Sequence, residues 1–180
     1  MHLSTQKAKL STREIMIFSA LSTMMFLSRI LMQWIPNVHL LGLFVAVMTL
    51  TYRRRALIPL YGYVLLDGVF AGFSMWWMPY LYIWLPLWAA FMGLGKLELP
   101  RKIQAPLYML VCALHGLSFG LLYAPAQALM FGFSFRATIA WIIAGLPFDI
   151  IHAIGNFAAG TMIIPLSTLL KNLDNGQYRA

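Results

Sequence analysis

The 180-residue chain is 61% hydrophobic and only 10% charged, with a mean hydropathy of +0.77 and a formal net charge of +8. Soluble domains carry roughly 25% charged residues, so this composition excludes an ordinary soluble domain and indicates an integral membrane protein of several helices. The positive charges lie at the ends of apolar runs, which is typical of membrane topology and argues against a nucleic-acid partner. The single cysteine, Cys112, allows no intrachain disulfide.

The first apolar run, residues 12–35, predicts a membrane-spanning helix. Ser11 or Thr12 fits the N-cap position, and Pro36 ends the run. The run is too long for the apolar region of a signal peptide, and no small-residue cleavage site follows it. We therefore expect it to be retained as the first helix.

Two features of this run indicate contacts other than lipid. Its first half carries three small residues, over which another helix could approach closely: Ser19, Ala20 and Thr23. Arg29 lies about one turn from its far end. That guanidinium either extends to the membrane interface or points into the bundle as an anchor for a polar ligand, and the sequence leaves both open.

The second and third runs are separated by three adjacent arginines. Residues 38–51 would span about 21 Å as a helix, which is less than the ~30 Å hydrocarbon core. The arginines at 53–55 are typical of a cytoplasmic stop-transfer cluster. Asp67 lies in the middle of the third run, residues 56–73. Because an ionisable group in hydrocarbon costs roughly 2.5–3.5 kcal/mol, we expect Asp67 to face the bundle interior.

Aromatic residues dominate the next part of the chain. Residues 74–79 predict a loop whose tryptophans lie where an interfacial aromatic belt is expected, and residues 80–95 predict a fourth helix. Tyr80, Trp84 and Trp88 recur every four residues and would form one helix face. Packing or interfacial anchoring explains the first two positions, whereas Trp88 lies deeper and is a candidate for stacking on a ligand.

A polar linker at 96–102 precedes the fifth predicted helix, residues 104–123. The charges of the linker indicate a cytoplasmic position. The helix contains His115 and a GxxxG pair, Gly116 and Gly120, which favours close helix packing.

The last third of the chain predicts one connection and one helix. Residues 124–136 contain proline and glycine, and we expect them to lie on the outer membrane surface. Residues 137–170 predict the sixth helix, which Pro147 is expected to bend. The predicted fold is therefore a single all-α domain, a compact bundle of six transmembrane helices.

Six spans place both termini on the same side of the membrane. Sorting the cations by this topology leaves eleven on the terminal side and one, Arg136, on the other, with Arg29 inside a helix. This bias predicts cytoplasmic termini. The eleven are Lys7, Lys9, Arg13, Arg53, Arg54, Arg55, Lys96, Arg101, Lys102, Lys171 and Arg179.

The sixth predicted helix contains the densest polar group of the apolar runs. Asp149, His152 and Asn156 are spaced by three and then four residues, so a helix puts them on one face. Two interpretations remain open. They either form a structural network with neighbouring helices or line a small-molecule site.

The sequence does not favour an enzyme. It contains no GxxxxGK[ST], HExxH, GxSxG or CxxC motif, so we expect no ATP hydrolysis by the chain itself and no catalytic residue. Asp67 and Asp149 raise the hypothesis of an intramembrane aspartyl protease, but their flanks lack the tyrosine–aspartate and Gly-x-Gly-Asp settings of such enzymes. His39, His115 and His152 lie on different segments, and no spacing supports a metal site.

Two stretches carry a resemblance to a known family. They are Pro147-Phe148-Asp149-x-x-His152-x-x-x-Asn156 and Ile35-Pro36-Asn37-Val38-His39-Leu40. With the basic six-helix layout, they resemble the substrate-binding S component of an energy-coupling factor (ECF) vitamin transporter. The chain departs from the paired alanines typical of the first helix of that family, because Met24 follows Ala20 by four residues. Ser19 and Thr23 form a small pair in its place.

The resemblance implies a protein of the bacterial plasma membrane that binds a vitamin from outside and has no cofactor of its own. It would dock, through Ser19, Ala20 and Thr23, on a transmembrane T subunit that works with two cytoplasmic ATPases. Cobalamin is the expected substrate, because the aromatic outer half suits a large, flat, mostly neutral ligand. Thiamine, riboflavin, a pyrimidine precursor, pantothenate and folate are alternatives, as is a membrane assembly subunit without a ligand.

The expected binding site lies in the outer half of the bundle. It would be formed between the aromatic segment 76–88 and the polar face of the sixth helix, with Arg29 and His39 at its rim. The candidate residues are Arg29, Trp34, Asn37, His39, Asp67, Trp76, Trp77, Tyr80, Trp84, Trp88, Asp149, His152 and Asn156.

Overall fold

The computed structural model describes residues 10–175, which form α-helices and short 3₁₀ segments and no β-strand. This part of the chain confirms the expected all-α class. In chain order the elements are α1 (Thr12–Met32), α2 (Leu41–Tyr52), η1 (Arg53–Ala56), α3 (Leu57–Ala71), η2 (Met75–Leu81), α4 (Leu85–Leu94), α5 (Arg101–Leu117), α6 (Phe119–Phe131), α7 (Phe135–Gly160) and α8 (Ile163–Asp174).

Three helical stretches within the described residues are long enough and apolar enough to cross a membrane. They are α1, the run Arg101–Phe131 made by α5 and α6, and α7. The helices α2, α3, α4 and α8 have 10 to 15 residues, fewer than the ~20 that a complete span needs. The described residues therefore confirm helices that could span a membrane by length and composition, whereas the six-span arrangement stays a prediction.

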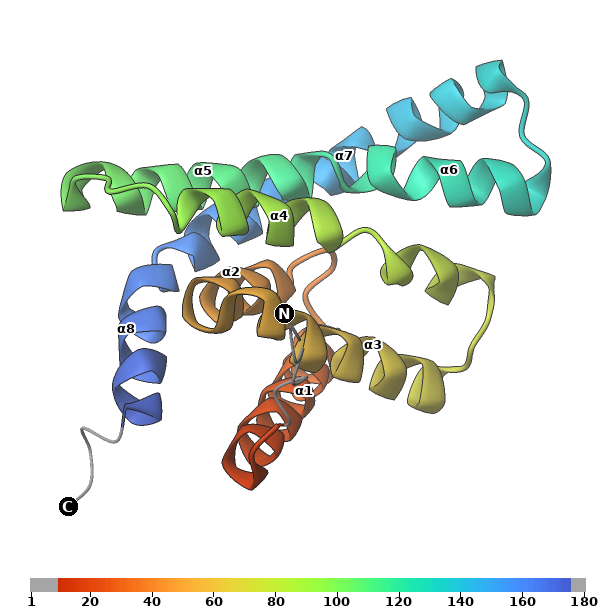
Figure 1. Ribbon diagram of the computed structural model, residues 1–180. Helices are drawn as coiled ribbons and strands as arrows, with labels where there is room; N and C mark the ends of the chain where they lie inside the picture. The colour runs from red at the N-terminus through yellow and green to blue at the C-terminus, as the bar shows by residue number, and fades with distance from the viewer. Residues whose placement is uncertain (1–9, 176–180) are drawn as a thin grey trace, which may run out of the picture.

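The helices form two groups around α2. In Figure 1, α5 and α6 run end to end as one long rod with α7 behind them, and α1 and α3 lie below. Eight of the nine residues from Leu41 to Thr49 in α2 are buried, with Phe44 only partly exposed. A helix that is apolar all round belongs in the interior of a bundle. The short second run thus forms the centre of the core.

The helix α1 begins where the sequence predicts, but it ends earlier than predicted. Ser11 caps the helix: its hydroxyl accepts the Glu14 N–H at 3.2 Å, and the Glu14 carboxylate accepts the Ser11 N–H at 2.9 Å. The helix ends at Met32, three residues before the predicted Ile35. Pro36 disfavours helical backbone at the residue before it, and Asn37 takes a positive φ of 58°. Residues 33–40 therefore form a loop.

The predicted fourth helix, residues 80–95, is shorter than expected. Met75–Leu81 form the 3₁₀ segment η2, and α4 begins only at Leu85. Pro86 lies in the first turn of α4, where its missing N–H and fixed φ are tolerated. Tyr80 and Trp84 consequently lie on η2 and at the N-cap of α4, whereas Trp88 lies within α4.

The prediction that residues 124–136 form a surface connection is wrong. The helix α6 continues to Phe131, and only residues 132–134 link it to α7. Pro125 lies inside α6 and removes one backbone hydrogen bond. The carbonyl left without its helical donor is that of Leu121. The Tyr82 hydroxyl donates to the neighbouring Leu122 carbonyl at 2.8 Å, a tertiary contact that holds this turn of α6.

The predicted sixth helix, residues 137–170, is two helices. Pro147 lies inside α7 without ending it, and the break occurs at Thr161–Met162, between α7 and α8. Pro165 explains the position, because it has no N–H to bond the Thr161 carbonyl four residues earlier.

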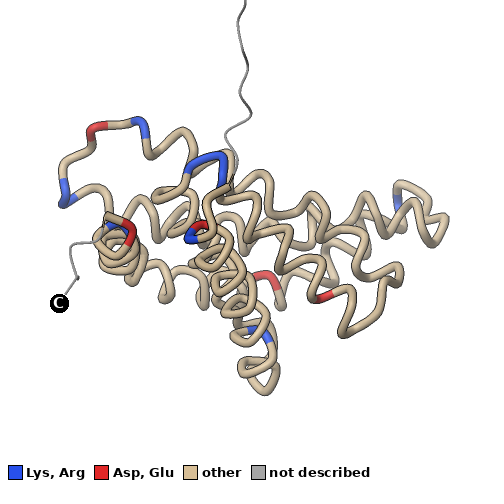
Figure 2. Tube along the Cα trace, turned by 60° about the horizontal axis from the view of Figure 1, so that its bottom comes forward, with Lys and Arg blue, Asp and Glu red and all other residues tan. Residues whose placement is uncertain are grey.

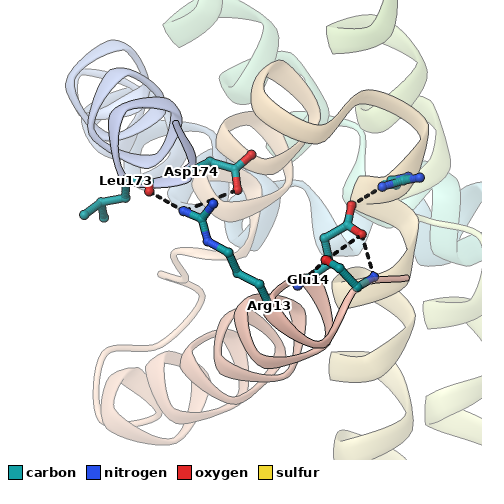
Figure 3. Close-up of polar contacts among 6 residues, drawn as sticks. Arg13, Glu14, Leu173 and Asp174 are labelled. Carbon is teal, nitrogen blue, oxygen red and sulfur yellow. Dashed lines mark hydrogen bonds and ion pairs between the residues drawn. The ribbon is translucent and has the colours of Figure 1, made fainter. Parts of the chain in front are cut away.

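The basic end of the molecule joins α1, η1 and α8. Figure 3 shows Arg13 reaching from α1 to the end of α8, where it donates to the Leu173 carbonyl at 2.6 Å and lies 4.0 Å from the Asp174 carboxylate. Glu14 forms an ion pair with Arg55 of η1. Most of the blue segments in Figure 2 gather at this end of the tube, which agrees with the predicted segregation of cations. Three of the sorted cations lie outside the described residues: Lys7, Lys9 and Arg179.

The arginine cluster does more than mark this end. Arg53 has a positive φ of 57° and donates to the Met92 carbonyl at 2.6 Å, which caps the last turn of α4. Together with the Arg55–Glu14 pair, this contact connects η1 to two helices.

Candidate functional site

An ion pair joins α1 to α3 inside the bundle. Arg29 Nη1 lies 2.8 Å from Asp67 Oδ1, and the side chain of Asp67 has no exposed surface whereas that of Arg29 is 28% exposed. The guanidinium carbon lies 5.7 Å from the centroid of the Trp76 ring, a cation–π distance. Of the two orientations that the sequence allowed, Arg29 has the one that points into the bundle.

Small residues bring the two helices close enough for this pair. The Ser22 hydroxyl donates to the Pro59 carbonyl at 2.9 Å, and a Cβ on Gly62 would overlap the Ser22 hydroxyl. This close contact of α1 with α3 sets the spacing at which a long arginine reaches a short aspartate.

A cavity of about 210 Å³ adjoins Arg29. It lies where the end of α1, the loop 33–40 and η2 meet. Its apolar wall includes Met32, Ile35 and Pro36, and its polar side chains are Arg29, Gln33, Asn37, His39 and Tyr80. Four of these five were predicted as site residues, and the cavity brings them together from segments up to 51 residues apart.

The polar face of α7 is directed at neighbouring segments. Asp149 and His152 are buried, as their shared helix face predicts. The Gly120 N–H lies 3.1 Å from each carboxylate oxygen of Asp149. The His152 Nε2 lies 3.0 Å from the His39 Nε2, so one ring donates to the other.

Asn156 completes this face by filling a space between two glycines. A Cβ on Gly42 of α2 would lie 3.2 Å from its Oδ1, and a Cβ on Gly116 of α5 would lie 2.8 Å from its Nδ2. A cavity of about 10 Å³ remains beside Asn156 and His152. This volume suits at most one water molecule, so the Asp149–His152–Asn156 face serves mainly to pack α7 in this conformation.

Aromatic rings connect the two polar groups. The ring centroids of Trp76 and Tyr80 are 5.8 Å apart, those of Tyr80 and Trp84 are 6.0 Å apart, and those of Trp84 and His115 are 5.7 Å apart. Phe119 lies 4.8 Å from the His152 ring. His39 lines both cavities and thus joins the Arg29 cavity to the packed α7 face.

Three of the predicted tryptophans line neither cavity and do not stack on Arg29. Trp34 is 84% exposed in the loop after α1. Trp77 donates its indole N–H to the Val64 carbonyl at 2.8 Å, a contact that holds η2 against α3. Trp88 donates to the Arg53 carbonyl at 3.3 Å, at the basic end of the molecule, and so does not extend the Tyr80–Trp84 pair.

The prediction missed two residues of the site. Gln33 lines the cavity from the C-cap of α1, four residues after Arg29, and this spacing would have indicated that the two side chains share a face. Tyr123 donates to the Trp76 carbonyl at 2.5 Å and positions η2. No sequence pattern relates Tyr123 to a residue 47 positions earlier.

The predicted docking residues form part of the outer surface of α1. Ser19, Ala20 and Thr23 are exposed, whereas Ser22 faces α3. The described chain therefore leaves this small-residue patch uncovered.

No family model matches the chain, and no curated protein or solved structure matches it either.

Proposed function

We propose that the protein is the vitamin-binding S component of an ECF-type importer. The supporting observation is the convergence of Arg29, Asn37, His39 and Tyr80 on one cavity within an otherwise apolar bundle. Charged and polar side chains are costly at membrane depth, and their grouping around a cavity is typical of a small-molecule site.

The charge distribution supports the orientation that uptake requires. Arg29 lies 16 residues after Arg13 on α1, which is about 24 Å along the helix axis. Arg13 belongs to the basic end, which the positive-inside rule assigns to the cytoplasm. In the proposed six-span topology the Arg29 cavity therefore lies toward the outer face.

The energy for import would come from partners. The sequence contains no phosphate-binding loop. We propose that the exposed patch Ser19, Ala20 and Thr23 docks on a transmembrane T subunit, which joins the chain to two cytoplasmic ATPases. Small side chains permit the close helix contact that such docking needs.

The cavity favours a smaller vitamin than the cobalamin expected from the sequence. Sites for drug-sized ligands have volumes of roughly 300–1,000 Å³. The Arg29 cavity has about 210 Å³, which suits a ligand of one or two rings, and a corrinoid would require the surrounding segments to separate.

Purification in mild detergent tests this proposal. The released small molecules would be identified by mass spectrometry, and binding of a vitamin panel that includes cobalamin would be measured by calorimetry. We expect one vitamin to bind and to be taken up by vesicles that also contain the T subunit and both ATPases. A protein that binds no vitamin and supports no uptake would instead be an assembly subunit without a ligand, and the proposal would be wrong.

A further inference from the structure

The Arg29 cavity has one permanent cation among its polar groups, and its other polar side chains are neutral. The guanidinium of Arg29 donates only, and Gln33, Asn37 and Tyr80 can each donate as well as accept. No aspartate or glutamate lines the cavity among residues 10–175. The ligand therefore needs an acceptor for the Arg29 N–H groups, and a negatively charged acceptor suits them best.

Each of the two buried carboxylates, Asp67 and Asp149, already lies against a neighbouring group of the protein. Asp67 has no exposed surface and lies next to Arg29, while Asp149 faces the Gly120 N–H. A cationic ligand in this cavity would meet the positive charge of Arg29 before it reached Asp67. Because charges interact strongly at low dielectric, the cavity disfavours a cation such as thiamine.

Arg29 has the capacity to hold a second carboxylate. Its contact with Asp67 uses one terminal nitrogen, Nη1, and an arginine side chain has five N–H groups. Within the described chain its guanidinium donates no further hydrogen bond, and 28% of the side chain is exposed. Asp67 and Trp76 hold the guanidinium in place, so little order is lost when a ligand pairs with its free edge.

We infer that the substrate of this cavity is a small organic acid whose carboxylate pairs with the free edge of Arg29. This inference rests on the proposed function and specifies its substrate class. The flat part of such a ligand would lie toward Tyr80, and the amides of Gln33 and Asn37 would bond its remaining acceptors.

Matched pairs of small molecules test whether the wild-type protein requires a carboxylate on its ligand. Each pair is an acid and its neutral analogue. The pairs are nicotinic acid with nicotinamide, biotin with biotinamide, and pantothenate with pantothenol, and thiamine is the cationic probe. We expect one acid to bind at least about tenfold more tightly than its neutral analogue, because hydrogen bonds between charged groups are stronger than neutral ones. Thiamine should show no measurable binding.

A substitution then identifies the partner of the carboxylate. Arg29→Lys keeps the charge but removes the paired donor geometry, and we expect it to weaken the acid about tenfold while changing the neutral analogue little. Arg54→Lys makes the same chemical change at an exposed arginine of η1 and should bind as the wild type does.

The outcomes separate this inference from the proposed function. A neutral or cationic vitamin that binds more tightly than every acid and is imported would overturn the inference and leave the proposed function intact. Equal binding of an acid by wild type and Arg29→Lys would also overturn it. Absence of any bound, co-purified or imported vitamin would overturn the proposed function and the inference together.

Discussion

Gly120 of α6 and Asp149 of α7 meet at a close contact between the two helices. The Gly120 N–H lies 3.1 Å from both carboxylate oxygens, and a Cβ on Gly120 would lie 2.5 Å from Asp149 Oδ2. The carboxylate thus depends on the absence of a side chain at position 120. Gly116 has the same role one turn earlier, because its Cβ would lie 2.9 Å from the His152 carbonyl oxygen.

The first prediction concerns Gly120→Ala. The added methyl must displace the Asp149 carboxylate, and overpacking of this kind costs about 1–3 kcal/mol. Gly145→Ala is the matched control in α7, because no other atom of residues 10–175 lies within 4 Å of its Cβ position outside the neighbouring helix backbone. Removing a helix-interior glycine there should stabilise the protein by roughly 0.5–1 kcal/mol. Thermal unfolding in detergent measures both, and equal shifts of the two midpoints would contradict the proposed contact.

A second prediction tests the Arg29–Asp67 pair through stability. Arg29→Met leaves the Asp67 carboxylate buried without a counter-ion, which should cost about 3 kcal/mol, the lower end of the range for a broken buried pair, because Arg29 is partly exposed. Asp67→Asn in the same chain removes that charge. The double variant should therefore recover at least half of the loss, as measured by tryptophan fluorescence during unfolding. Additive losses would show that the two side chains are not coupled.

The polar face of α7 could be predicted because it depends on local spacing alone. Intervals of three and four residues put Asp149, His152 and Asn156 on one side of any helix, and Asp149 and His152 are indeed buried there. The GxxxG pattern at Gly116 and Gly120 likewise predicted a close helix contact.

The Arg29 cavity could be predicted only in part. Arg29 and Asp67 are 38 residues apart, and their pairing depends on the contact between Ser22 and the Pro59 carbonyl, which no local pattern records. The sequence therefore indicated that each charged side chain would be costly in lipid, but it did not predict that Arg29 and Asp67 form an ion pair.

The predicted helix boundaries were wrong near prolines, because a proline can either lie inside a helix or accompany a break between two helices. Pro125 and Pro147 lie inside α6 and α7, whereas Pro165 follows a break between two helices. Beside the Leu121 carbonyl that Pro125 leaves without a helical donor, the Tyr82 hydroxyl donates to the Leu122 carbonyl and holds α6 from outside the helix. Proline alone predicts a missing hydrogen bond and does not predict whether the surrounding structure replaces it.

The third prediction concerns topology. Cysteines at positions 54 and 98, both exposed, should be protected from a membrane-impermeant reagent in intact cells and should react after permeabilisation, because the cations of this end belong in the cytoplasm. A cysteine at position 34, 84% exposed in wild type, should react from outside. The native Cys112 is 1% exposed and should stay silent. External labelling at 54 or 98 would overturn the proposed orientation.

The last prediction concerns docking through α1. Ala20 lies on an exposed surface between Ser19 and Thr23, where a partner helix can approach only while the side chains stay small. Ala20→Trp should therefore abolish uptake in vesicles that contain the T subunit and the ATPases, and it should leave vitamin binding to the isolated protein unchanged.

Leu31→Trp provides the control for this substitution. Leu31 is 75% exposed and follows Ala20 by eleven residues, three helical turns along the same face, so a tryptophan there enlarges the lipid-facing surface without entering the small-residue patch. Its uptake should match that of wild type. If Ala20→Trp also transports at the wild-type rate, the interface lies elsewhere on the bundle. If it loses vitamin binding as well, the residue acts on the fold and not on the partner.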